Sequence, residues 1–98
     1  MARCRNPPRR YKGYRIVYPE KMPDKRLGGI NCYAAKDPYW GLPYPHPCGT
    51  ILIDPNQGCP AIRATIRHEI IEKTIMEETG LPYKEAHRLT EKIEKVIK

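Results

Sequence analysis

The last third of the chain carries two helical patterns separated by a glycine, and no other feature constrains the fold as strongly. From Ala61 to about Thr79, isoleucines recur every four residues and form two stripes on roughly opposite sides of a helix. Gly80 ends this helix, and Pro82 suits the first turn of a second one. The second helix is expected to bury Ala86, Leu89, Ile93 and Val96 or Ile97. The short connection therefore predicts an antiparallel helical hairpin over residues 61–97, whose first helix is covered on both sides.

The first half of the chain predicts short strands. Residues 14–18 are rich in aromatic and β-branched types, and residues 49–54 form the clearest strand pattern. Residues 30–35 give a weaker second strand, because Asn31 interrupts the pattern. Four prolines exclude a central strand over residues 37–48, where an aromatic-lined loop is expected instead. The predicted fold class is α+β, with two or three short antiparallel strands packed against the C-terminal two-helix hairpin.

The size and the cysteines set limits on stability. A chain of 98 residues makes one small domain with little spare stability, so helix packing needs a further restraint. Four cysteines without a C-x-x-C pair argue against a four-cysteine zinc site, and they fit either two disulfides in one of three pairings or free thiols: Cys4, Cys32, Cys48 and Cys59. Intracellular disulfides are expected mainly in hyperthermophiles, and the eleven prolines are compatible with a thermophilic source.

No stretch of the sequence predicts export or membrane insertion. There is no secretory h-region near Met1, and the apolar runs are only a few residues long. We therefore expect a soluble, cytoplasmic protein without a membrane partner.

The positive charge is concentrated at the N-terminal end. Residues 1–36 hold ten Lys and Arg against two acidic residues, within a total net charge of +7. Six of these basic residues, interleaved with tyrosines, could follow a phosphate backbone: Arg3, Arg5, Arg9, Arg10, Lys12 and Arg15. The composition predicts a flexible basic arm over residues 1–12 and a single domain over residues 13–98. Such an arm either binds nucleic acid or only keeps a small protein in solution.

The first predicted helix carries the pattern His68-Glu69-Ile70-Ile71-Glu72. Positions four apart lie one turn above another, so His68 and Glu72 can point at the same place, and His87 on the second helix could complete a three-ligand metal site. Glu69 would then be the base that takes a proton from metal-bound water. The competing interpretation is a histidine with an i,i+4 partner on a solvated face. Because Glu72 lies beside a buried stripe, where an unpaired carboxylate is costly, the metal-site hypothesis is favoured.

Three further residues belong to this hypothesis in smaller roles. Tyr83, one turn before His87, could donate to an oxyanion or orient a ligand, or it could simply cap the core. Glu94 is a candidate outer partner of His87, and otherwise a solvated charge. His46 could supply an extra ligand from the proline-rich loop, or have no special role there.

These motifs together resemble those of the small zincin-like metalloproteins found in archaea, viruses and phages, and more distantly those of the minimal gluzincin peptidases. The resemblance spans roughly residues 49–97 and rests on Gly49-Thr50-Ile51-Leu52-Ile53-Asp54, Thr65-Ile66-Arg67-His68-Glu69, Gly80, Tyr83, Ala86-His87 and Glu94. It implies a divalent metal, zinc first, held by His68, Glu72 and His87, and a hydrolase acting on peptide or protein substrates.

The resemblance also implies how a substrate would bind and where this chain departs from the pattern. An extended substrate would align along an edge strand at residues 51–53. In the zincin pattern H-E-x-x-H the second histidine stands where this chain has Glu72. A carboxylate ligand weakens the Lewis acidity of the metal and shifts preference toward harder metals than zinc.

Overall fold

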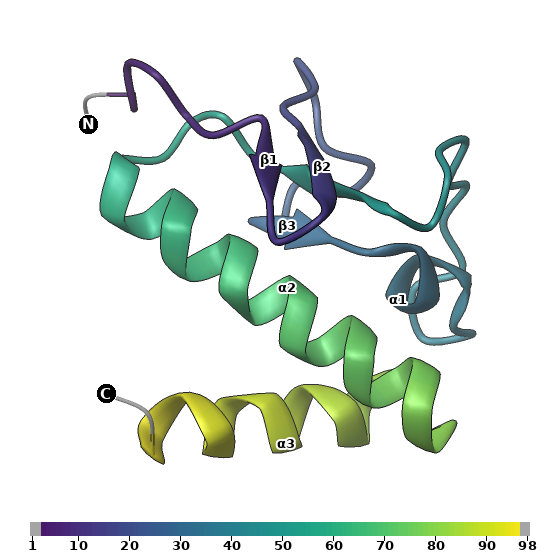
Figure 1. Ribbon diagram of the computed structural model, residues 1–98. Helices are drawn as coiled ribbons and strands as arrows, with labels where there is room; N and C mark the ends of the chain where they lie inside the picture. The colour runs from purple at the N-terminus through teal and green to yellow at the C-terminus, as the bar shows by residue number, and fades with distance from the viewer. Residues whose placement is uncertain (1–2, 97–98) are drawn as a thin grey trace.

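The computed structural model describes residues 3–96, which form an α+β fold (Figure 1). The elements follow in the order β1 (Arg10–Tyr11), β2 (Tyr14–Val17), β3 (Gly29–Ile30), α1 (Cys32–Lys36), β4 (Thr50–Ile53), α2 (Cys59–Thr79) and α3 (Tyr83–Val96). The long helix α2 crosses beneath the small sheet, and α3 folds back along it at the bottom of the view. Within these residues no helix is both long enough and apolar enough to cross a membrane.

The sheet is mixed and has four strands, in the order β1-β2-β4-β3. The pairs β1–β2 and β3–β4 are antiparallel, whereas β2 and β4 run parallel with Ile16 opposite Ile51. The expected α+β fold is confirmed, but the expectation of two or three antiparallel strands is wrong in the number of strands and, for the β2–β4 pair, in direction. A parallel pair needs a long crossover between its strands, and the residues between β2 and β4, which contain β3 and α1, supply it.

The predicted strand over residues 30–35 is also wrong beyond Ile30, because the chain turns into the short helix α1. Asn31 is its N-cap: the side-chain oxygen accepts a hydrogen bond from the Ala34 N–H at 3.0 Å, which satisfies one of the free donors of the first turn. A disulfide between Cys32 and Cys48 ties this helix to the chain just before β4. Capping and the covalent link thus outweigh the strand pattern.

The cysteines form two disulfides, Cys4–Cys59 and Cys32–Cys48, and none is free. The first joins the N-terminal segment to the start of α2. That segment is further held by a hydrogen bond from the Cys4 N–H to the Gln57 carbonyl and by β1, which pairs with β2. The part of the predicted flexible arm that is described is therefore docked on the domain.

The helical hairpin is confirmed, although α2 begins two residues earlier than predicted. Gly80 ends α2 in the left-handed conformation, at φ 74°, as its position in the sequence predicts. In α3, Ala86 is buried as predicted and Thr90 is buried too, but Leu89 is 39% exposed and Val96 is 82% exposed. Only a narrow stripe of α3 meets α2, so the prediction for Leu89 is wrong. Of the alternatives Val96 and Ile97, Val96 is exposed and Ile97 lies outside the described residues.

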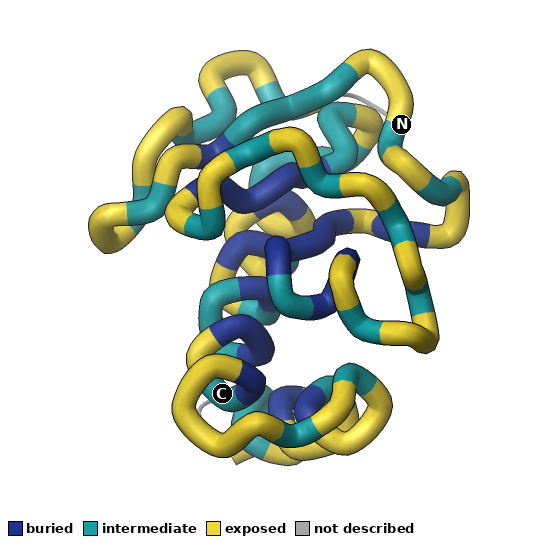
Figure 2. Tube along the Cα trace, turned by 90° about the vertical axis from the view of Figure 1, so that its right-hand side faces the viewer, coloured by how far each residue is buried: buried dark blue, intermediate teal, exposed yellow. Residues whose placement is uncertain are grey.

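The core lies where the sheet, α1 and α2 face one another (Figure 2). Side chains of β4 alternate between two apolar clusters, with Leu52 in one and Ile51 and Ile53 in the other. Because Ile62 and Ile66 of α2 belong to the second cluster, that stripe of the helix is fixed against the sheet. This contact sets the rotation of α2 and so turns its polar residues toward α3 and the sheet edge.

Candidate metal centre

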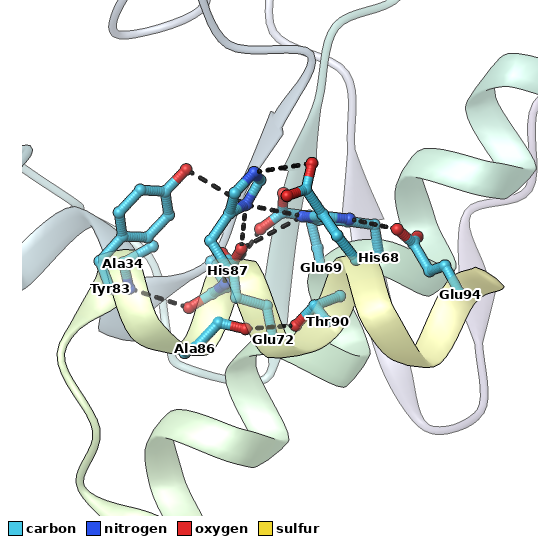
Figure 3. A network of polar contacts seen from close by, with 11 residues as sticks. Ala34, His68, Glu69, Glu72, Tyr83, Ala86, His87, Thr90 and Glu94 are labelled. Carbon is cyan, nitrogen blue, oxygen red and sulfur yellow. Dashed lines mark hydrogen bonds and ion pairs between the residues drawn. The ribbon is translucent and has the colours of Figure 1, made fainter. Parts of the chain in front are cut away.

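Three side chains from the helical hairpin meet in one cluster that could hold a metal ion (Figure 3). His68 and Glu72 stand one turn apart on α2, and His87 faces them from α3. Glu72 Oε2 lies 2.8 Å from His87 Nδ1 and 3.1 Å from His68 Nε2, and the two imidazole nitrogens are 3.1 Å apart. The structure therefore brings together the three predicted ligands.

The donor atoms fit a small divalent ion. Zinc binds imidazole nitrogen and carboxylate oxygen at about 2.0–2.2 Å, so the edges of its coordination tetrahedron are about 3.3 Å long. The three donor atoms here are separated by 2.8–3.1 Å and form a triangle only slightly smaller than one face of that tetrahedron. Three protein ligands leave a fourth position, which is the arrangement of catalytic rather than structural zinc sites.

Each candidate ligand has its own outer partner. His68 Nδ1 lies 3.1 Å from Glu94 Oε1, and His87 Nε2 lies 3.6 Å from Glu91 Oε2. Asn31 Nδ2 donates to Glu72 Oε1 at 3.3 Å. Contacts of this kind fix the orientation of ligands and, for histidine, the tautomer. Glu94 was expected beside His87 and is found beside His68, because it lies a further two turns along α3 and so meets an earlier part of antiparallel α2.

Burial and charge perturb the titrating groups of the cluster. Burial lowers the pKa of His68, but the neighbouring carboxylates, with Glu72 foremost, outweigh it and raise the pKa to about 9. Burial, reinforced by the Glu72 carboxylate, raises the pKa of Glu69 to about 8. The metal-free cluster therefore holds protons at neutral pH, and a metal ion has to displace them in order to bind.

Glu69 faces an open cavity of about 460 Å³ beside the cluster. Its lining residues are Arg26, Leu27, Gly28, Gly29, Trp40, Ala64, Thr65, His68, Glu69, Tyr83, His87 and Glu94. Asn31 Nδ2 donates to Glu69 Oε1 at 2.9 Å and holds this carboxylate in place. The expected base thus shares one cavity with the two histidines.

Close packing of β3 on α2 shapes the floor of this cavity. A Cβ atom at Gly29 would lie 2.7 Å from Thr65 Cγ2, 2.9 Å from Ile53 Cδ1 and 3.1 Å from Glu69 Cγ. Only glycine permits this approach, which brings the sheet edge directly over the helix that carries His68 and Glu69.

Tyr83 stands at the entrance to the cluster. Its hydroxyl oxygen lies 3.5 Å from His87 Nδ1, and its ring stacks on His87 and on Tyr39 with centroids 5.4 and 5.3 Å apart. The Tyr83 N–H donates to Asp37 Oδ2 at 2.9 Å, which anchors the start of α3. Burial raises the pKa of the Tyr83 hydroxyl to about 12, so the group stays a hydrogen-bond donor at neutral pH.

Other candidates lie away from the cluster. His46 packs against the Tyr44 ring at 5.6 Å between centroids and is not among the three clustered residues. The six predicted nucleic-acid-binding residues are all exposed, on the N-terminal segment, on β1 and β2 and in the turn that joins these strands: Arg3, Arg5, Arg9, Arg10, Lys12 and Arg15. The predicted edge strand at residues 51–53 is wrong, because β4 pairs with β2 on one side and with β3 on the other.

Two residues that no sequence motif marks as candidates belong to the site. Asn31 bridges the carboxylates of Glu69 and Glu72, and Glu91 approaches His87. The i,i+4 spacing of His87 and Glu91 could have identified the second of these. Asn31 could have been identified only as a helix N-cap, since its contact with α2 spans about forty residues.

Comparison of the chain with known proteins found no matching family model, no matching curated protein and no matching solved structure. The likeness to small zincin-like metalloproteins therefore rests on the motifs of the sequence alone.

Proposed function

We propose that His68, Glu72 and His87 bind one divalent metal ion, with zinc favoured. The observation that carries this proposal is the triangle of donor atoms, each of whose side chains has an outer partner of its own. Two imidazoles and one carboxylate are a donor set that zinc accepts. Burial of Glu72 to 1% exposure adds support, because a buried carboxylate needs a positive partner.

Metal binding is tested by calorimetric titration of the metal-free protein with zinc. We expect one equivalent to bind in the wild type and in His46→Ala, whose histidine lies outside the cluster. We expect His87→Ala to lose that binding, because a pair of ligands replaces a triangle. Equal binding by His87→Ala and the wild type would contradict the proposal.

We propose further that the metal-loaded site hydrolyses a peptide or protein substrate. A bound divalent ion supplies a polarised water at the open coordination position. Glu69, which faces the same cavity, would accept the proton of that water as its oxygen attacks the peptide carbonyl, and would pass the proton to the amine that leaves when the C–N bond breaks. Tyr83 would donate a hydrogen bond to the oxyanion that develops. Because β4 is an interior strand, the substrate has to lie along the cavity wall, which Gly28 and Gly29 of the β3 region line.

The hydrolytic step is tested with Glu69→Gln in zinc-loaded protein. We expect loss of peptide cleavage with zinc content unchanged, since Glu69 is a base and not a ligand. Glu78→Gln is the matched control, because Glu78 is exposed on the same helix. Retained cleavage in Glu69→Gln would overturn the assignment of Glu69.

A second proposal concerns the basic N-terminal region, which we infer binds nucleic acid. The observation that favours it is the register of β1 and β2, which sets Arg10 directly opposite Arg15. Like charges opposite one another destabilise a strand pair. Among residues 3–96, none of the six basic residues named above forms an ion pair that would relieve this repulsion. A phosphate backbone would relieve it.

Nucleic-acid binding is tested by anisotropy of a labelled single-stranded oligonucleotide at increasing salt. We expect affinity to fall steeply with salt, and the double variant Arg10→Gln/Arg15→Gln to bind more weakly with a shallower salt slope. Lys92→Gln/Lys95→Gln, on exposed positions of α3, is the control. Substitution is preferable to truncation here, because removing residues 1–12 also removes β1 and the Cys4–Cys59 disulfide. Binding that is absent or insensitive to salt would rule the proposal out.

A further inference from the structure

Asn31 is a fully buried amide placed between the two carboxylates of α2. It is 0% exposed, and its Nδ2 lies 2.9 Å from Glu69 Oε1 and 3.3 Å from Glu72 Oε1. An amide nitrogen carries two hydrogens, so each carboxylate can receive one. A single neutral side chain thus contacts both the expected base and an expected ligand.

The orientation of this amide is fixed by its other end. Asn31 Oδ1 accepts the Ala34 N–H at 3.0 Å, and because a backbone N–H can only donate, the oxygen has to lie on that side. The Asn31 carbonyl also accepts the Ala35 N–H at 3.0 Å, and the next residue, Cys32, is bonded to Cys48. The amide nitrogen is therefore locked toward α2.

The contacts divide the two oxygens of Glu72 between different partners. Oε1 is held by Asn31, whereas Oε2 is 2.8 Å from His87 Nδ1 and 3.1 Å from His68 Nε2. A free carboxylate can bind a metal through one oxygen or through both. Hydrogen bonding of Oε1 to a buried donor withdraws that oxygen from the metal position.

We propose that Asn31 is a positioning residue that restricts Glu72 to binding through Oε2 alone, and so keeps a coordination position open for water. This inference rests on the proposed metal centre. The same amide holds Glu69 away from the ligand triangle, where it remains free to act on that water. Without the amide donor, Glu72 turns so that both of its oxygens reach the metal, and the open position is filled.

Cobalt(II) substitution tests the inference, because its visible absorption is intense in four-coordinate sites and weak in sites with more ligands. The variants are Asn31→Ser and Asn31→Asp, which both keep an oxygen that can cap α1 and both remove the amide donor. We expect the wild type to show the intense spectrum and both variants to show the weak one. We also expect cobalt affinity to fall about 10- to 100-fold, as is typical when an outer partner of a ligand is lost.

The outcomes separate this inference from the metal proposal. A wild type that binds no cobalt defeats the metal centre itself. Variants that fold, bind cobalt and keep the wild-type spectrum overturn the role of Asn31 while the metal centre stands.

A measurement on the wild type keeps the inference testable if the variants do not fold. NMR of the Asn31 side-chain NH₂ is expected to show both hydrogens protected from solvent exchange before and after zinc binding. Rapid exchange of either hydrogen in the zinc-bound protein would overturn the inference.

Discussion

Three residues of α2 are both charged and buried, a combination that a helix selected only for stability would avoid. Glu69, Glu72 and Lys73 are 6%, 1% and 7% exposed, although buried charges are costly unless paired. Lys73 is paired with Glu77 at 2.9 Å, and Glu72 with two histidines. The carboxylate of Glu69 has only the amide of Asn31 as a direct hydrogen-bond partner among the described residues. A buried carboxylate with one neutral partner is typical of functional sites, where groups are held in perturbed protonation states.

The perturbed groups predict a pH dependence for the metal-free protein. The folded-state pKa of His68 is about 9 and that of Glu69 about 8, and both are raised above their ordinary values. Between the ordinary pKa and the folded-state pKa of each group, the folded protein binds more protons than the unfolded protein. The free energy of unfolding therefore falls as pH rises through this range. The contribution of His68 is complete below about pH 6.5 and is lost as pH rises through about 9.

Urea denaturation at pH 6, 7.5 and 9 measures this effect. We expect the free energy of unfolding to decrease across the series in metal-free protein, and to decrease less with saturating zinc, which replaces the protons. A metal-free protein whose stability is constant or rises over this range would contradict the assigned protonation states.

Gly29 gives a second prediction at the scale of one residue. An alanine Cβ there meets the stiff side chain of Thr65 at 2.7 Å, so Gly29→Ala is expected to destabilise the protein by about 1–3 kcal/mol. The control is Gly49→Ala, because a Cβ atom at Gly49 meets nothing within 4 Å. Chemical denaturation of both variants makes the comparison. Equal stability of the two variants would mean that β3 does not pack this closely on α2.

Among the helices and strands, the sequence predicts those that are determined by a local pattern of residues. The hairpin of α2 and α3 follows from the isoleucine spacing and from Gly80, and β4 from its run of β-branched residues. By contrast, β1 and β3 have two residues each and exist only because a longer strand lies beside them. No periodicity can appear in two residues, so such strands escape analysis of the sequence.

The same distinction holds for the candidate site. His68 and Glu72 are brought together by helix geometry alone, which is why their spacing predicts the contact. The contact of His87 with His68 and Glu72 depends on how α3 is rotated about its axis against α2. The sequence is compatible with the observed rotation but does not determine it. The contact of Asn31 depends on the packing of α1 against α2 and could not be predicted from any local pattern.

The two disulfides are expected to stabilise the protein by different amounts, because they close loops of different length. Cys32–Cys48 closes a separation of 16 residues and Cys4–Cys59 one of 55. The chain-entropy relation then gives about 3 kcal/mol for the shorter loop and about 4 kcal/mol for the longer one. We expect replacement of both cysteines of Cys4–Cys59 by serine to cost more stability than the same replacement of Cys32–Cys48, as measured by guanidinium denaturation. A larger loss from removing Cys32–Cys48 would show that this disulfide acts mainly on the native structure around α1.

At the scale of the whole molecule, charge and site are separated. Figure 1 shows the sheet above α2 and α3 below it. The basic β1–β2 hairpin belongs to the sheet, whereas the His-Glu-His cluster lies between α2 and α3, and none of the six basic residues lines the cavity beside it. The docked N-terminal segment fixes this arrangement through Cys4–Cys59. A phosphate backbone bound at the basic hairpin would therefore leave the cavity beside His68 accessible.

This separation predicts that the two proposed activities are independent. We expect the affinity for a single-stranded oligonucleotide to be the same in metal-free and zinc-loaded protein, because no basic residue of the hairpin lies in the cluster. Anisotropy titrations with and without saturating zinc make the comparison at constant ionic strength. A change of more than about 5-fold would reveal coupling between the surfaces.

Zinc-edge X-ray absorption of the reconstituted protein tests the metal centre most directly, because it reports the ligands themselves. We expect one zinc per chain with two imidazole nitrogens and two oxygens at about 2.0–2.2 Å, one oxygen from Glu72 and one from water. His68→Ala should lose one imidazole signal or the zinc altogether. A wild-type protein that retains no zinc, or whose zinc is bound without imidazole, would rule out a metal centre at His68, Glu72 and His87.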